Sequence, residues 1–186
     1  FGFNSGSALA ANATAAMAFG TTTIASASAM MTWIFFDRIN GRKISALGAC
    51  IGAVVGLVAI TPGCGYVSIA ESIFIGFISA IVSNMAVNWK KLKSVDDTLD
   101  VFACHGIGGI MGMILTAIFA RGENASLLHG GVGVFAHHMT ALLLVSVFTF
   151  FGALVIYKIT DFIIPLRVEE TSEELGLDIS QHNESI

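Results

Sequence analysis

A histidine in the middle of a long apolar stretch is the strongest chemical signal in this sequence. His105 lies near the centre of residues 99–120, an almost uncharged run that is long enough to cross a bilayer. Neutral imidazole donates and accepts hydrogen bonds, so it can contact a small polar solute at that depth without a permanent charge. Ionisable groups inside membranes usually mark solute or proton pathways. We therefore expect His105 to line a pathway; the alternative is a core histidine bonded to a neighbouring helix.

Helical spacing predicts that His105 shares one face with residues one and two turns away. Steps of three and four residues place these positions on one stripe: Asp97, Val101, His105, Gly108 or Gly109, and Gly112. Glycine beside His105 would leave room for a narrow lumen or a close helix. Val101, one turn below, would keep the approach to the histidine dry.

Carboxylates gather at the predicted start of the same helix. Asp96, Asp97 and Asp100 lie there, where such side chains accept hydrogen bonds from free backbone amides and interact favourably with the positive end of the helix dipole. We expect these three residues to cap the helix near one end of the pathway. Glu71 is expected to cap the start of the third apolar segment in the same way.

The first seven residues combine aromatic rings with small hydroxyl side chains. Phe3 and Ser7 both precede the first long apolar segment. Aromatic faces attract cations, and hydroxyl groups replace hydration contacts, so this segment could form a mouth that admits a small cation.

The sequence predicts neither a metal site nor a disulfide framework. His137 and His138 are adjacent and point in different directions on a helix, and no cysteine or carboxylate lies three or four residues away to complete a ligand set. The three cysteines are odd in number, and two of them lie within apolar runs. We expect no cofactor and no enzymatic activity.

The composition excludes an ordinary soluble domain. Hydrophobic residues make up 55% of the chain and charged residues 12%, and the mean hydropathy is +0.81, whereas charged residues are about a quarter of a typical soluble domain. The sequence has no basic surface for nucleic acid. It is that of a polytopic membrane protein.

Five apolar segments of membrane-spanning size follow one another along the chain. They cover approximately residues 15–36, 44–60, 69–89, 99–120 and 134–157, each near the ~20 residues that a crossing helix needs. These segments lack the alternating polarity of barrel strands, so they must satisfy their backbone hydrogen bonds as helices. The predicted fold is an all-α transmembrane helical bundle over residues 1–164, followed by a tail over residues 165–186.

The basic residues predict the orientation of this bundle. Of the nine, only Arg121 lies on one side, while the others follow the first, third and fifth segments on the opposite side. The positive-inside rule makes the latter side cytoplasmic. We expect the tail inside the cell and the segment around Phe3 outside.

Small residues predict close helix packing in the second segment. Gly48, Gly52 and Gly56 make two overlapping G-x-x-x-G steps on one face. Such a face lets a neighbouring backbone approach closely. A structural role is therefore expected for these glycines.

Four stretches of sequence together resemble the second half of the ammonium transporter family (Amt/Mep/Rh). They are FNSGSA at residues 3–8, TPGCGY at 61–66, DDTLDVFACHG at 96–106, and residues 166–182. Their order, their spacing and the number of spans fit the family over essentially the whole chain. The Asp-Val-Phe sequence before His105 is similar to the Amt/Mep branch rather than the Rh branch.

The resemblance implies a homotrimer whose protomers each have eleven helices, arranged as an inverted repeat around a central pore. By this likeness His105 is the second of two paired pore histidines, and Phe3 is one ring of a stacked phenylalanine gate. Ser7 belongs to the outer ammonium-recruitment site, and Val101 lines the lumen. The first pore histidine and the second gate ring belong to the other half of the family pattern.

The resemblance also implies a function in the plasma membrane. Ammonium would be selected outside and lose its proton near the mouth, and neutral ammonia would then pass His105, because an apolar lumen penalises a whole cation. A PII-type signal protein would dock on the cytoplasmic face, at Arg42, Lys43 and the tail. The alternative is an ammonium-sensing membrane receptor with little net flux. An intramembrane metalloenzyme comes third, because only His105 lies at depth.

Overall fold

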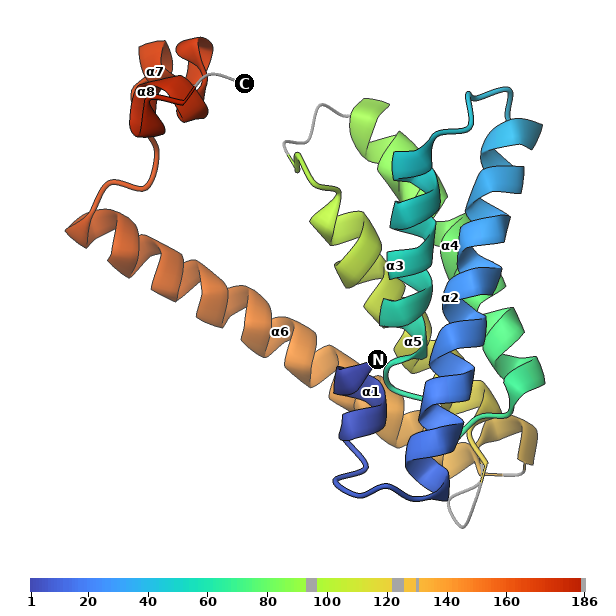
Figure 1. Cartoon of the computed structure of the whole chain (residues 1–186). Helices are drawn as coiled ribbons and strands as arrows, with labels where there is room; N and C mark the ends of the chain where they lie inside the picture. Colours follow the sequence, from blue (N-terminus) through green and yellow to red (C-terminus); the bar gives the residue numbers. More distant parts are fainter. Residues whose placement is uncertain (93–96, 122–125, 130, 185–186) are drawn as a thin grey trace. The chain divides into compact units, whose positions relative to one another are not determined.

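The computed structural model describes residues 1–92, 97–121, 126–129 and 131–184 (Figure 1). The regular elements of these ranges are all helices, which confirms the all-α prediction. In chain order they are α1 (Gly2–Gly6), α2 (Ala13–Ile39), α3 (Ala46–Ile60), α4 (Ile69–Leu92), the π-helix η1 (Phe102–Ile107), α5 (Gly108–Phe119), the 3₁₀ turn η2 (Leu127–His129), α6 (Val132–Ile163), α7 (Glu170–Leu175) and α8 (Leu177–His182).

Polar side chains cap the first turns of the helices α2 and α3. The Asn12 side chain accepts a hydrogen bond from the Ala15 amide at the start of α2, and Ser45 accepts one from the Gly48 amide at the start of α3, both at 2.9 Å. Each bond satisfies a backbone donor that has no partner within the helix. After α3 the chain turns at Pro62, which cannot continue a helix.

Three stretches of the described chain are long and apolar enough to cross a membrane. They are Ile69–Trp89, Phe102–Phe119 and Val132–Ile163. The helix α3 is apolar but has 15 residues. The helix α2 has 27 residues, and it falls outside this group because threonines and serines lower its hydropathy. The five predicted segments therefore all form helices, but two of them differ from a typical apolar span.

Most hydroxyl groups of α2 are bonded to backbone carbonyls, which suits a helix without water around it. Thr23 donates to the Phe19 carbonyl at 2.8 Å and Thr32 to the Ser28 carbonyl at 2.7 Å, both one turn back. Ser26 donates to Ala53 of α3 at 3.1 Å, and Ser28 to Ile73 of α4 at 2.9 Å. Bonds of this kind satisfy polar groups within a bundle and join neighbouring helices.

The helices α2, α3, α4 and α5 pack side by side in the first of two compact units, residues Phe1–Leu142 (Figure 1). Their contacts are very close at glycine. A side chain on Gly56 of α3 or on Gly76 of α4 would overlap the same carbonyl, that of Ala25 in α2. Gly52 and Gly56 of α3 thus lie where the backbone of α2 passes, as close packing requires, whereas Gly48 lies against side chains.

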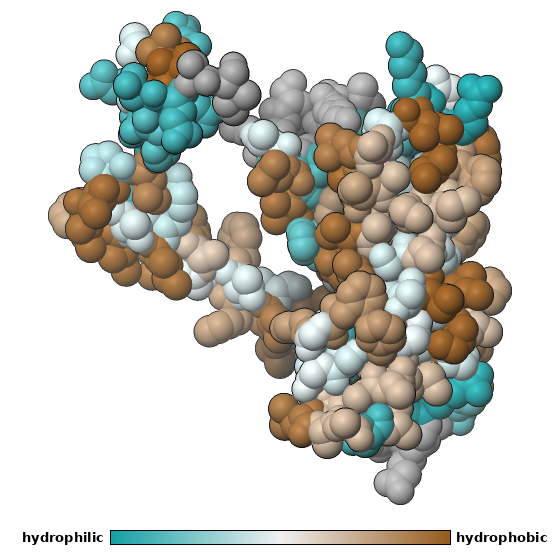
Figure 2. Space-filling view, viewed as in Figure 1, coloured by the Kyte–Doolittle hydropathy of each residue, from teal (hydrophilic) through white to brown (hydrophobic). Residues whose placement is uncertain are grey.

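Charged residues of this unit lie at the two ends of the helices. At one end Arg42, just after α2, pairs with Asp37 at 2.7 Å and donates to Asn84 of α4 at 2.5 Å. At the other end Arg121 pairs with Glu71 at 2.7 Å. Figure 2 shows the same distribution, because hydrophilic side chains gather mainly at the helix ends and the middle of the unit is largely brown to white. A band of this kind suits a bilayer.

The second unit is Leu143–Ile186 and contains the end of α6 and the tail helices α7 and α8. Within it, Arg167 donates to both carboxylate oxygens of Glu173, at 2.7 and 2.9 Å. The Ser180 hydroxyl donates to the Ser172 carbonyl at 3.2 Å, which joins α8 to α7. The helix α6 ends at Ile163, one residue before the predicted boundary between bundle and tail.

Candidate functional site

Phe3 and His105 lie far apart in the sequence and line the same hollow of the first unit. Its volume is about 270 Å³, and its wall is formed by Phe1, Phe3, Asn4, Thr22, Val54, Leu57, Val58, Thr61 and His105. This hollow, called here the histidine hollow, draws on α1, α2, α3 and η1. His105 is its one ionisable side chain, and most of the other groups are apolar.

Ser7 lines a second hollow, of about 190 Å³, called here the serine hollow. Its wall shares Phe3, Asn4 and Thr61 with the histidine hollow. The Ser7 hydroxyl donates to the Phe3 carbonyl at 2.6 Å, so Ser7 and Phe3 belong to one local structure. Phe3 therefore contributes to both hollows at once.

The serine hollow contains several polar groups but carries no formal charge. Its wall is Phe3, Asn4, Ser7, Ala8, Thr14, Ala18, Thr61, Pro62, Cys64, Gly65 and Tyr66. Burial raises the pKa of the Cys64 thiol, which keeps that group neutral near pH 7. Hydroxyl, carbonyl and aromatic groups without a fixed charge can coordinate a small cation weakly and release it again.

His105 lies within η1, a π-helix that runs directly into α5. The amide of Gly108 donates to the His105 carbonyl, and the amide of Cys104 donates to the Asp100 carbonyl at 2.9 Å. Short π-helical segments occur within longer helices and are frequent at functional sites. In this chain the imidazole is exposed, while its neighbours Ala103 and Cys104 face the core.

Two glycines of the predicted stripe, Gly108 and Gly112, lie against neighbouring helices. Helical spacing places His105, Gly108 or Gly109, and Gly112 on one face, where glycine is expected to leave room for a narrow lumen or a close helix. In the structure Gly112 packs directly against the Ala59 carbonyl, and Gly108 faces Val58 and Ser83. These two glycines allow helix contact, the second of the expected roles, and His105 lines the hollow.

The remaining predicted residues lie around the start of η1. Val101 is 50% exposed and is not part of the wall of either hollow, so its lumen contact stays a prediction. The Asp97 carboxylate accepts hydrogen bonds from the amides of Val101 at 2.9 Å and Phe102 at 3.0 Å. Asp100 has a φ of 55°, a left-handed conformation that aspartate tolerates better than most residues. Asp96 lies outside the described residues.

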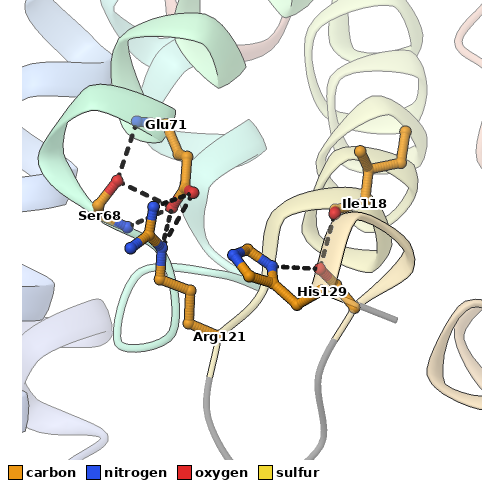
Figure 3. Close-up of polar contacts among 6 residues, drawn as sticks. Ser68, Glu71, Ile118, Arg121 and His129 are labelled. Carbon is orange, nitrogen blue, oxygen red and sulfur yellow. Dashed lines mark hydrogen bonds and ion pairs between the residues drawn. The ribbon is translucent and has the colours of Figure 1, made fainter. Parts of the chain in front are cut away.

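The polar cluster at the Arg121 end joins three segments of the chain (Figure 3). The Glu71 carboxylate accepts from the Ser68 amide at 2.6 Å and from Arg121 Nη2 at 2.7 Å, while the Ser68 hydroxyl in turn accepts from the Glu71 amide at 3.3 Å. This reciprocal pair is a capping box. The hydrogen bond from Arg121 to the Glu71 carboxylate raises the pKa of Arg121 further above its usual value.

His129 lies at the same end of the unit and contacts the Ser126 hydroxyl. Ser126 donates its hydroxyl hydrogen to the Ile118 carbonyl at 2.7 Å, and His129 Nδ1 lies 3.1 Å from that hydroxyl (Figure 3). Because the hydroxyl hydrogen is used, Nδ1 must be the donor in this contact. The His138 Nδ1 lies 2.9 Å from the Val134 carbonyl within α6. Across the described ranges, no three histidine, cysteine or acidic residues come together as a metal site.

Sequence reasoning missed the polar residues that support Phe3. Asn4 exposes 7% of its surface and Thr22 none, and both contribute to the wall of the histidine hollow. A signal for them was present, since a buried amide or hydroxyl in an apolar region must have a hydrogen-bond partner. The hydrogen-bond partners of these two residues could not be predicted from spacing along the sequence, because they come from different helices.

The sequence model of the Ammonium Transporter Family matches residues 1–186, the whole chain. The chain belongs to the ammonium transporter family. The ammonium transporter of Bacillus subtilis is 41% identical over 190 residues, covering 99% of this chain and 47% of the relative. Ammonium transporter Amt1 of Archaeoglobus fulgidus is 38% identical over 187 residues, covering 99% of this chain and 48% of the relative.

Solved structures of family members share the fold. The crystal structure of Candida albicans Mep2 aligns with a TM-score of 0.85 at 32% identity, over 97% of this chain and 42% of that chain. A structure titled "Sensor Amt Protein" aligns with a TM-score of 0.82 at 28% identity, over 97% of this chain and 45% of that chain. This chain of the ammonium transporter family therefore spans about half the length of the relatives that it matches.

Proposed function

We propose that this chain forms one wall of an ammonium pathway across the plasma membrane. The observation that carries the proposal is the place of Phe3, which contributes to both the serine hollow and the histidine hollow. A solute that left the first hollow for the second would pass the Phe3 ring. The relatives named as ammonium transporters supply the identity of that solute.

The side chains of the two hollows suit a solute that enters the serine hollow as ammonium and reaches the histidine hollow as neutral ammonia. The serine hollow offers hydroxyl groups and an aromatic face, which can replace part of the hydration of ammonium. The histidine hollow is mainly apolar, and a charged solute there would lose hydration without compensation. Ammonia needs no such compensation, and the His105 imidazole can donate to it or accept from it. Transfer of one proton from ammonium to water at the outer mouth, before ammonia passes the Phe3 ring, therefore fits the sequence of environments.

Exposure on this unit fits a pathway wall that a second half completes. Phe3 is 77% exposed, Phe102 is 64% exposed, and His105 is exposed as well. Aromatic rings and an imidazole at membrane depth need a covering surface or a narrow lumen. In the arrangement proposed here, that surface carries the first pore histidine and the second gate ring.

The assembly and its regulator are part of the same proposal. The protein is a homotrimer with the tail and the Lys43 end on the cytoplasmic side, where a PII-type signal protein docks. Arg42 is held by Asp37 and Asn84, while Lys43 is exposed, so Lys43 is the more accessible cation of the pair. Equal binding of a PII protein after Lys43→Glu combined with removal of residues 169–186 would remove this docking site.

A receptor is the second candidate, and it is favoured by the similarity to the structure titled "Sensor Amt Protein". A receptor would bind ammonium and change its tail without meaningful flux. Flux through the purified protein separates the two functions directly.

The test uses the full-length protein in proteoliposomes, with ammonium uptake and ammonium-induced current recorded together. His105→Ala and Phe3→Ala are compared with two controls. His138→Ala removes an imidazole bonded within α6, and Phe148→Ala removes a ring that is 79% exposed, much like Phe3.

We expect the first two variants to lose uptake or to leak cations while the trimer stays folded, and the two controls to behave as the parent. An inactive parent that still binds ammonium would favour the receptor. Normal flux and ammonium selectivity in folded His105→Ala and Phe3→Ala would overturn the proposed pathway.

A further inference from the structure

The short helix α1 is tied to two other elements by a buried amide. Asn4 Nδ2 donates to Thr22 Oγ1 of α2 at 3.1 Å, and Thr61 Oγ1, directly after α3, donates to Asn4 Oδ1 at 3.1 Å. The Cys64 thiol also lies 4.0 Å from the Asn4 carbonyl. Asn4 thus joins α1 to α2 and to the turn after α3.

These two bonds fix which side of the Asn4 amide carries the nitrogen and which carries the oxygen. The nitrogen faces an oxygen that accepts, and the oxygen faces a hydroxyl that donates. The Thr61 hydroxyl also has the Leu57 carbonyl within reach, at 2.8 Å, so its one hydrogen has two acceptors. In the bond from Asn4 to Thr22, by contrast, the amide hydrogen has a single acceptor, Thr22 Oγ1.

The helix α1 needs this support because it cannot hold its position alone. It has five residues, and isolated helices of that length are unstable in water. Phe3 directly precedes Asn4, so fixing the Asn4 side chain also fixes the direction in which the Phe3 ring leaves the helix. Asn4 and Thr61, like Phe3, contribute to the walls of both hollows.

We infer that Asn4 is the positioning residue for the Phe3 ring, and that its bonds to Thr22 and Thr61 set the selectivity of the passage between the two hollows. The inference rests on the proposed ammonium pathway. Asn4 itself need not contact the solute, because it acts through the ring beside it. Loss of either bond lets the ring move at the boundary, so a larger cation passes more easily.

The experiment measures selectivity and stability in the same preparations of the full-length protein. Asn4→Leu keeps the approximate side-chain size and removes both polar atoms. Thr22→Val and Thr61→Val each remove one hydroxyl, and Thr22→Ser and Thr61→Ser restore it. Ser5→Ala is the matched control, because the Ser5 hydroxyl lies beside Asn4, is buried and has no hydrogen-bond partner.

The readouts are uptake of ammonium, uptake of methylammonium, current carried by potassium, and thermal unfolding of the trimer. Asn4→Leu is expected to raise the ratio of methylammonium to ammonium uptake, or of potassium to ammonium current, by at least about two- to tenfold, because it loses two neutral hydrogen bonds and each allows a factor of that size. The valine variants shift these ratios in the same direction, the serine variants return them, and Ser5→Ala leaves them unchanged.

Lower thermal stability with unchanged ratios in Asn4→Leu and in both valine variants would reduce Asn4 to a packing role and overturn the inference. If Asn4→Leu does not fold, the comparison of Thr22→Val with Thr22→Ser decides the matter by the same ratios. A parent protein without ammonium flux would instead defeat the proposed function, which is a different result from a parent that transports and variants that keep its selectivity.

Discussion

Gly112 of α5 lies directly against the carbonyl of Ala59 in α3, with no room for a side chain between the two helices. Gly109, one turn earlier on the same helix, has open space, since a side chain there would only touch Val58 at 4.0 Å. Helix contact therefore requires glycine at position 112 but not at position 109.

This difference predicts opposite effects of one substitution. Gly112→Ala should destabilise the protein by about 1 to 3 kcal/mol, because the added methyl group forces two backbones apart. Gly109→Ala should be neutral or stabilising by up to about 1 kcal/mol, since alanine favours the helix. Thermal unfolding of the purified protein in one detergent compares the two. Equal losses at both positions would contradict the close contact at Gly112.

Glu71 should matter more to stability than its ion-pair partner. Glu71→Ala removes a capping bond to Ser68 as well as the pair with Arg121, and we expect a loss of about 1 to 3 kcal/mol. Arg121→Ala should cost less than Glu71→Ala, because the Arg121 side chain is 56% exposed and solvent screens the pair.

Glu71→Gln is the control for this comparison, because glutamine keeps a cap oxygen for Ser68 and loses the charge. Its unfolding temperature should fall near that of Arg121→Ala. A value close to that of Glu71→Ala would mean that the charge, and not the cap, is the main contribution.

The tail should loosen in acid through Glu173. The hydrogen bond from Arg167 holds the pKa of the Glu173 carboxyl below its usual value. A group with a lowered folded pKa stabilises the fold above its unfolded pKa and loses that effect as the pH falls through the folded pKa. The order of α7 should therefore decrease when the pH drops below the usual range of glutamate, about 4.

Hydrogen exchange of residues 166–182, corrected for the intrinsic rate, measures this loosening in the full-length protein. Arg167→Gln should exchange faster than the parent at pH 7 and match it in acid. A constant difference between the two at every pH would rule out the ion pair as the cause.

Cysteine labelling tests the orientation of the first unit. Leu9, before α2, is 93% exposed, and Lys43 is exposed at the opposite end of the same helix. In a full-length protein without native cysteines, an impermeant maleimide should label Leu9→Cys in intact cells and label Lys43→Cys only after lysis. Labelling of Lys43→Cys in intact cells would invert the topology.

The sequence by itself determined the class of the protein and the five helical segments, and it singled out His105 as a candidate pathway residue. Composition and run length suffice for the first two, because a bilayer restricts the chain to helices of a certain length. The match of residues 1–186 to the ammonium transporter family confirmed the resemblance carried by the motifs around Phe3, Thr61 and His105. These are properties of local sequence.

The tertiary structure decided which residues meet. Periodicity assumed a regular α-helix around His105 and left open whether its glycines faced a lumen or a helix. The structure has the π-helix η1 there, with Gly112 against α3 and His105 at the hollow. The pairing of Glu71 with Arg121, and the bonds of Asn4 to Thr22 and Thr61, join segments that are 18 to 57 residues apart. Spacing along one helix cannot predict such contacts, because they depend on how closely different helices pack and on where each buried polar group finds its partner.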